Sequence, residues 1–298
     1  LQISGERLMT AGGGAAKSQG MILSSSPPRV YEIAMPEPQT IPVVLASPHS
    51  GRDYPADFLA ATRLSEAQLA ASEDRYVDEL VAAAPLLGAP LIRGVFPRSF
   101  VDLNRAAYEM DPAMFDEPLP DFVNTRSPRV AAGLGVIPRV AARGVDSDHH
   151  PMRVYAALRE LVDATLERFG VCLLVDCHSM PSDSPPGRDR PPAFVLGDCH
   201  AMSCAPSIVG EAERVLQEQG YRVARNRPYA GGFTTRHYGQ PKRGVHALQI
   251  EINRALYMDE RKLGRLPGFD GLAAALTRLV AALGARLAQL ADDAPDHR

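Results

Sequence analysis

Residues 41–51 read IPVVLASPHSG, and residues 171–179 read VCLLVDCHS. In each segment a short apolar run, typical of a buried strand, leads into a histidine, His49 in the first and His178 in the second. Open α/β sheets collect ligands and metal ions in the crevice outside the carboxyl ends of their strands. The two segments therefore predict an α/β sheet that carries two imidazoles at this edge, which suggests a metal site.

The rest of the chain alternates between strand patterns and helical periodicity, which indicates the α/β class. Apolar residues at helical spacing predict three helices. The first begins near Asp74, the second ends at Gly170, and the third carries a long apolar stripe from Leu272 to Leu290. Strand patterns are found at 42–47, 90–95, 99–103, 171–176, 193–197, 221–225 and 245–251.

The composition limits both the domain count and the class of partner. No linker rich in Pro, Ser and Gly divides the 298 residues into two patterned halves, so we expect one domain over 30–298. Residues 1–29 hold few large apolar side chains, and we expect a flexible N-terminal arm there. Lys and Arg total 32 against 35 Asp and Glu, a net charge of −3 without a basic stripe, which argues against nucleic acid.

The sequence also favours a soluble protein that acts on a small molecule. No uninterrupted apolar run reaches the length of about 18 residues that a membrane span needs. The first residues lack the basic start and apolar stretch of a secretory signal, so we expect no membrane partner and a cytoplasmic location. The sequence is compatible with a homo-oligomer.

Four cysteines raise the question of a structural zinc site. Cys172 and Cys177 are five positions apart in one predicted strand, so a straight strand would turn them to opposite faces. Cys199 and Cys204 form the second pair. We expect all four to be buried, unpaired thiols.

A catalytic zinc ion needs three protein ligands and one open position for water. His49 and His178 supply two ligands, and two acids compete for the third place. Asp53 follows His49 in the same loop, whereas Asp74 lies at the start of a helix that faces the sheet. We prefer Asp74, because a rigid helix terminus fixes a ligand better than a loop does.

Other polar residues at predicted strand ends suggest the remaining parts of an active site. Glu251 closes the strand at 245–251 and is a candidate general base, the alternative being a solvated acid. Asn104 and Arg105 form a pair suited to a substrate carboxylate, and Arg98 is held in reserve for an oxyanion. The Gly-rich segment 226–244 contributes the substrate-binding candidates Arg236 and His237, or else is a solvated loop.

Five segments in this order resemble the N-formylglutamate amidohydrolase family, over roughly residues 41–258. That family is similar in turn to the zinc carboxypeptidases and to aspartoacylase and succinylglutamate desuccinylase. The segments are PHSG at 48–51, DLNR at 102–105, DCHS at 176–179, TRHYG at 235–239 and GVHALQIE at 244–251.

The resemblance implies a three-layer α/β/α sandwich around a central mixed, mainly parallel sheet of the phosphorylase/hydrolase-like, zinc-carboxypeptidase-like type. It also implies one zinc ion per chain on His49, Asp74 and His178, with Glu251 as the base. Arg52 stands where the relatives of the family carry a glutamate ligand, and the resemblance favours Asp74 as its replacement. Asn104 and Arg105 match a pair that holds a substrate carboxylate in those relatives.

The implied reaction is hydrolysis of N-formyl-L-glutamate, or of a related N-acyl acidic amino acid, to formate and glutamate. An alternative with the same metal is a carboxypeptidase, or a deacylase for another N-acyl amino acid. A third hypothesis is a binding protein without catalysis on a hydrolase fold. Retention of His49, His178 and Glu251 argues against this third hypothesis.

Overall fold

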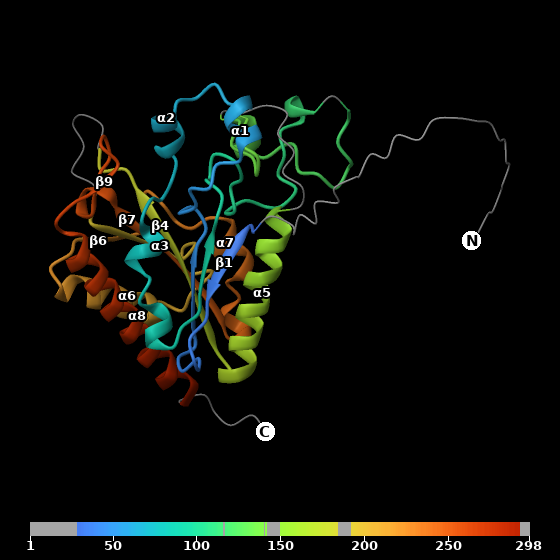
Figure 1. Ribbon diagram of the computed structural model, residues 1–298. Coiled ribbons are helices and arrows are strands. Elements are labelled where there is room, and N and C mark those ends of the chain that lie inside the picture. Colours follow the sequence, from blue (N-terminus) through green and yellow to red (C-terminus); the bar gives the residue numbers. More distant parts are fainter. Residues whose placement is uncertain (1–28, 116, 140, 142–149, 184–191, 293–298) are drawn as a thin grey trace, which may run out of the picture.

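The computed structural model describes residues 29–115, 117–139, 141, 150–183 and 192–292. The expected N-terminal arm therefore lies, except for Arg29, outside the described residues. A seven-stranded sheet in the order β1-β3-β2-β4-β7-β5-β6 forms the centre (Figure 1). Its strands are β1 (Tyr31–Ala34), β2 (Val43–Ser47), β3 (Leu91–Gly94), β4 (Cys172–Met180), β5 (Phe194–Gly197), β6 (Val223–Arg225) and β7 (Val245–Asn253).

The sheet is mixed and mainly parallel, as predicted. β3, β2, β4 and β7 run parallel to one another, β1 is antiparallel to β3, and β5 is antiparallel to β7 while parallel to β6. The strands that carry the two predicted histidine segments, β2 and β4, are direct neighbours. Their carboxyl ends therefore meet at the same edge of the sheet.

Helices cover both faces of the sheet and complete the predicted three-layer sandwich (Figure 1). α3 (Val77–Leu80), α6 (Pro206–Glu218) and α8 (Phe269–Asp292) bury their apolar residues on one face, and α5 (His150–Phe169) packs on the other together with α7 (Phe233–Tyr238). The remaining elements are short: α1 (Ala56–Ala61), α2 (Glu66–Ala70), η1 (Ala84–Leu87), η2 (Pro112–Met114), α4 (Pro128–Ala131), η3 (Pro241–Arg243), η4 (Arg254–Leu256), and the hairpin β8 (Met258–Asp259) and β9 (Gly264–Arg265).

The central sheet differs from the strand predictions in two places, and the short hairpin β8–β9 was not predicted either. Residues 99–103 were expected to be a strand, but they form turns and an irregular stretch outside the seven-stranded sheet. Val101 and Leu103 are nevertheless buried in the core. Apolar residues at alternate positions, such as Val101 and Leu103, predict a strand, but a turn that packs one side on the core has the same pattern. β1 escaped prediction because it is a four-residue edge strand whose side chains are only partly buried.

The face of the sheet beneath α5 and α7 changes from apolar to polar towards the carboxyl ends of its central strands. On β4, Cys172 and Leu174 belong to the core of this face, whereas Asp176 and His178, further along on the same side, are polar. On β7 the same change leads from Ala247 to Gln249 and Glu251, which lie directly opposite Asp176 and His178. The polar end of this face is where a site can form.

The cysteines and the last long helix both belong to the core. All four cysteines are buried free thiols, as predicted, and Cys172 and Cys177 pack on opposite faces of the sheet. Residues Phe269–Leu290 of α8 are long and apolar enough, by length and composition alone, to cross a membrane. Leu272, Leu279 and Leu283 are nevertheless buried against the sheet, so α8 is a core helix.

Gly51 provides a test of the turn that follows β2. A Cβ atom at this position would overlap the backbone carbonyl groups of Val95 and Phe96. We expect Gly51→Ala to lower the free energy of unfolding by about 1–3 kcal/mol, the usual cost of overpacking. The matched control is Gly264→Ala, where nothing lies within 4 Å of the added atom. Equal urea midpoints for the two variants would contradict this close packing.

Candidate active site

Three buried side chains from separate elements meet at the polar edge of the sheet. His49 lies in the turn after β2, His178 is on β4, and Asp74 precedes α3 by three residues. The backbone N–H of Asp74 donates to the carbonyl of His49 over 3.0 Å, which fastens the two loops together. Each of the three residues is at most 3% exposed.

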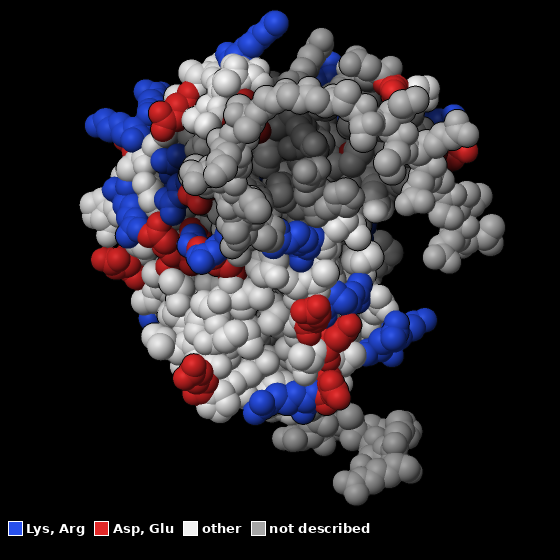
Figure 2. Space-filling model, turned by 45° about the vertical axis from the view of Figure 1, so that its right-hand side comes forward, with Lys and Arg blue, Asp and Glu red and all other residues white. Residues whose placement is uncertain are grey.

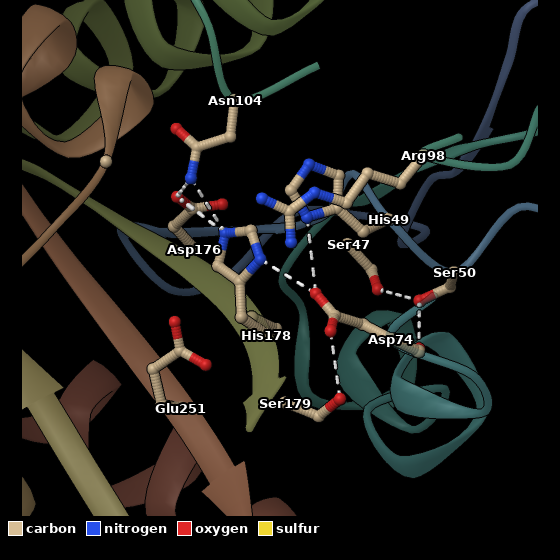
Figure 3. A network of polar contacts seen from close by, with 12 residues as sticks. Ser47, His49, Ser50, Asp74, Arg98, Asn104, Asp176, His178, Ser179 and Glu251 are labelled. Atoms are coloured by element: carbon tan, nitrogen blue, oxygen red, sulfur yellow. Dashed lines mark hydrogen bonds and ion pairs between the residues drawn. The ribbon is translucent and has the colours of Figure 1, made fainter. Parts of the chain in front are cut away.

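The geometry of these side chains is that of a metal-binding cluster (Figure 3). The Oδ2 atom of Asp74 lies 3.3 Å from Nδ1 of His49 and 2.9 Å from Nδ1 of His178. One ligand atom from each residue lies within 4.8 Å of the other two. The structure thus brings together the three residues that the sequence proposed as ligands.

Each imidazole lies between two carboxylates. Nδ1 of both rings faces Asp74, while Nε2 of His49 lies 2.8 Å from Asp102 and Nε2 of His178 lies 3.0 Å from Asp176. With a metal ion on the Nδ1 side, the far carboxylate would hold the proton on Nε2 and leave the Nδ1 lone pair for the ion. The donor set therefore fits a metal ion.

The charges around the cluster favour the same arrangement. Burial opposes ionisation of Asp74, but hydrogen bonds from His178 and His49 hold the pKa of Asp74 well below its usual range. Burial likewise opposes a charged His178, but Asp176 and Asp74 hold the pKa of His178 well above its ordinary value. The negative charges that favour a protonated imidazole here also favour a bound metal cation.

The second oxygen of Asp74 is held by the protein. Oδ1 accepts a hydrogen bond from the Ser179 hydroxyl at 2.9 Å and lies 3.4 Å from Nη2 of Arg254. Arg254 is itself buried and donates to the backbone carbonyls of Ala71 and Glu73 at 3.0 and 2.8 Å. These contacts leave Oδ2 free to face the two histidines.

The cluster opens into a cavity of about 570 Å³. The lining combines the cluster with several arginines and with the segment 228–232. Glu251 lies on β7 directly opposite His178 of β4, and Figure 3 shows it beside that histidine. Burial is the main cause that raises the pKa of Glu251, to about 8, with a smaller contribution from Asp74. A carboxylate of raised basicity that faces the cavity can accept a proton from water.

Arg98, Asn104 and Arg105 all line the cavity, and Asp102 and His178 engage them. Arg98 donates from Nε to Asp102 at 3.0 Å and remains partly exposed. The Asn104 amide nitrogen lies 3.1 Å from Nε2 of His178, whereas Arg105 uses all three guanidinium nitrogens on Asp102 and on backbone carbonyls. Arg98 therefore faces the cavity more freely than Asn104 and Arg105 do, because the Asn104 amide is engaged at both ends.

The remaining predicted residues are distributed inside and outside the cavity. Arg236 is exposed and lines it. Among the residues that the structure describes, His237 is not part of the lining: it stacks on Phe233 and lies 3.0 Å from Arg159. Asp53, the alternative ligand, is exposed and outside the cluster.

The sequence matches the N-formylglutamate amidohydrolase family model over residues 41–258. The chain belongs to this family. It is therefore an amidohydrolase, an enzyme that hydrolyses an amide bond. The matched range contains the whole metal-binding cluster and Glu251.

Similar proteins come from several bacteria. A protein named N-formylglutamate deformylase from Pseudomonas putida is 29% identical over 231 residues, covering 74% of this chain and 83% of its own. A protein of the same name from Pseudomonas aeruginosa is 31% identical over 233 residues, which cover 74% of this chain and 84% of that protein. The crystal structure of N-formylglutamate amidohydrolase from Ralstonia eutropha JMP134 matches with a TM-score of 0.80 and 33% sequence identity. The match covers 87% of this chain and 99% of the Ralstonia chain.

Several residues of the amidohydrolase site were not found from the sequence. Asp176 could have been, because it is two residues before His178 on one strand and so shares its face. The contact of Asp102 with His49 and those of Arg254 with Ala71 and Glu73 carry no such signal, because they join segments distant in sequence. Arg129 of α4 and Tyr229 of the cavity loop also join the lining only through the tertiary fold.

Metal content tests the ligand set. We expect Asp74→Asn to reduce bound metal sharply, because it removes the negative charge between the two Nδ1 atoms, whereas Asp53→Asn should leave metal content unchanged. Elemental analysis after dialysis gives the metal content, and circular dichroism confirms that both variants fold. Loss of metal from the Asp53 variant alone would move the third ligand to the turn after β2.

Proposed function

We propose that the protein hydrolyses N-formyl-L-glutamate, or a closely related N-acyl acidic amino acid, to formate and glutamate, with one zinc ion per chain. The observation that carries this proposal is the buried cluster of His49, Asp74 and His178 with Glu251 beside it in an arginine-lined cavity. The names of the family and of its relatives in Pseudomonas and Ralstonia support the substrate.

The choice of zinc follows from the donor set. Two neutral imidazole nitrogens and one carboxylate oxygen are typical ligands of catalytic zinc, whereas calcium and magnesium prefer oxygen ligands alone. Asp102 and Asp176 accept from the two histidines on the far side, an arrangement that fixes the ring orientation around bound zinc. His49, Asp74 and His178 would hold the ion and leave the cavity side open.

Zinc held by His49, Asp74 and His178 would supply Lewis acidity for an amide carbonyl and for water in the cavity. Glu251 takes the proton of the attacking water and passes it to the leaving amine nitrogen. Arg98 faces the same space and balances the negative charge that develops on the carbonyl oxygen. Fixed contacts with Asp102 hold Arg98 in place before the reaction begins.

A dianionic substrate needs cations, and the cavity supplies them. Arg129 and Arg236 are both exposed and line the cavity, and in the part of the chain that the structure describes neither side chain is engaged by an acid. Elsewhere the surface charges are mixed: Figure 2 shows described blue and red side chains intermingled over one face. We infer that Arg129 and Arg236, together with Asn104, bind the two carboxylates.

Glu251→Gln tests the mechanism, because it keeps the size of the side chain and removes the base. We expect zinc to stay bound and kcat to fall by about 10² to 10⁴, the usual contribution of a general base. KM for N-formylglutamate should change little, because the arginines that bind the carboxylates are intact. Formate release gives both constants. A kcat within about threefold of the wild type, well inside that range, would mean that another group activates the water.

Arg236→Gln tests the substrate. Loss of a charge-assisted contact should raise KM for N-formylglutamate by about tenfold to a hundredfold, with kcat nearly unchanged. If Arg236 pairs with the side-chain carboxylate, the variant and the wild type should handle N-formylglutamine equally well. Lys242→Gln, an exposed change on η3, is the matched control. An unchanged KM for N-formylglutamate would remove Arg236 from the binding site.

A further inference from the structure

Gln249 lies two residues before Glu251 on β7, so both side chains point to the same face of the sheet. They lie opposite Asp176 and His178 of β4, and both line the cavity although they are only 5% and 7% exposed. Gln249 is neither a member of the metal-binding cluster nor an acid or base. Its burial beside the proposed base therefore needs a separate explanation.

The two ends of the Gln249 amide can be told apart because one partner can only donate. The backbone N–H of Gly232 lies 2.7 Å from Oε1 of Gln249, and the Thr235 hydroxyl lies 3.4 Å from the same atom. The other end is then the NH₂ group, whose nitrogen lies 2.7 Å from Oε1 of Glu251. The Gly232 backbone thus fixes Gln249 as a donor to the Glu251 carboxylate.

This contact occupies one of the two carboxylate oxygens of Glu251. Among the hydrogen bonds of the described residues, the bond from Gln249 is the one that reaches the Glu251 carboxylate, and it uses Oε1 alone. The second oxygen stays available to accept a proton in the cavity. A donor on one oxygen restricts the rotation of the carboxylate and so keeps the second oxygen in a defined place.

The segment 228–232, which supplies Gly232, has anchors of its own. The N–H of Cys199 donates to the carbonyl of Ala230 at 2.7 Å, and the N–H of Thr234 donates to Asn104 at 2.8 Å. These bonds hold the segment on both sides of Gly232. Loss of the Gln249 side chain should therefore disturb Glu251 more than the segment itself.

We propose that Gln249 is a positioning residue that orients the Glu251 carboxylate for proton transfer, and that the Gly232 N–H sets the orientation of its amide. The inference rests on the proposed role of Glu251 as the base. A general base must lie within hydrogen-bond reach of the proton it takes, and a misplacement of about 1 Å can cost about a hundredfold in rate.

Two substitutions test the contact with the base. Gln249→Met keeps the length and removes both hydrogen bonds, whereas Gln249→Asn keeps the amide but shortens the side chain, so it cannot reach Gly232 and Glu251 together. We expect both to lower kcat by about tenfold to a hundredfold, with KM and zinc content unchanged. Gln217→Met, at an exposed position of α6, is the matched control and should behave as the wild type. A Gln249→Met enzyme of normal kcat would overturn the proposal.

A double-mutant cycle with Glu251→Gln shows whether Gln249 acts through the base. In that background, with formate release followed at excess enzyme, Gln249→Met should lower the rate by less than about twofold, because interacting residues are not additive. An equal loss in both backgrounds would overturn the proposal and assign Gln249 to the loop. If Glu251→Gln alone leaves kcat unchanged, the proposed role of Glu251 as the base fails instead, so the two failures are distinguishable.

Discussion

Two imidazoles and the Asp74 carboxylate converge on one buried point, and the rest of the site is arranged around this convergence. With Asp102 and Asp176 at the far nitrogens, this buried group holds three carboxylates, whose charge favours a cation, either a proton on the imidazoles or a metal ion between them. Ser179 and Arg254 engage the second oxygen of Asp74, so Oδ2 is directed at the two Nδ1 atoms. The protein thus holds the three candidate ligand atoms in place through contacts of its own.

The sheet makes this arrangement rigid. β2 and β4 are adjacent parallel strands, so a histidine on β4 and one just after β2 are held close by backbone hydrogen bonds rather than by flexible loops. Asp74 comes from outside the sheet, and its backbone bond to His49 and the contacts of Arg254 tie it to the same frame. On the opposite side β7 places Gln249 and Glu251 beside β4 in register. Catalytic groups on strands are positioned more accurately than groups on loops.

Charge is divided between the floor and the opening of the cavity. Asp74, Asp102 and Asp176 lie buried at the floor, and histidines or arginines contact each of them. The exposed Arg129 and Arg236 line the same cavity with no acid engaging them in the described part of the chain. A metal cation is therefore favoured at the floor and an anionic substrate nearer the solvent, which is the combination that the proposed reaction requires.

The sequence by itself determined the α/β class and the strands that lead to His49 or carry His178 and Glu251, because a short apolar run is a local feature. It also placed Cys172 and Cys177 on opposite faces of the sheet, because alternation along a strand has a fixed period of two. Only the tertiary structure decided how loops close on that sheet. It placed Asp74, which the sequence already favoured over Asp53, in the cluster, engaged Arg105 with Asp102, and left His237 outside the cavity lining. These outcomes depend on hydrogen bonds between segments far apart in the chain, such as those of Arg254 to Ala71 and Glu73, and no local pattern encodes them.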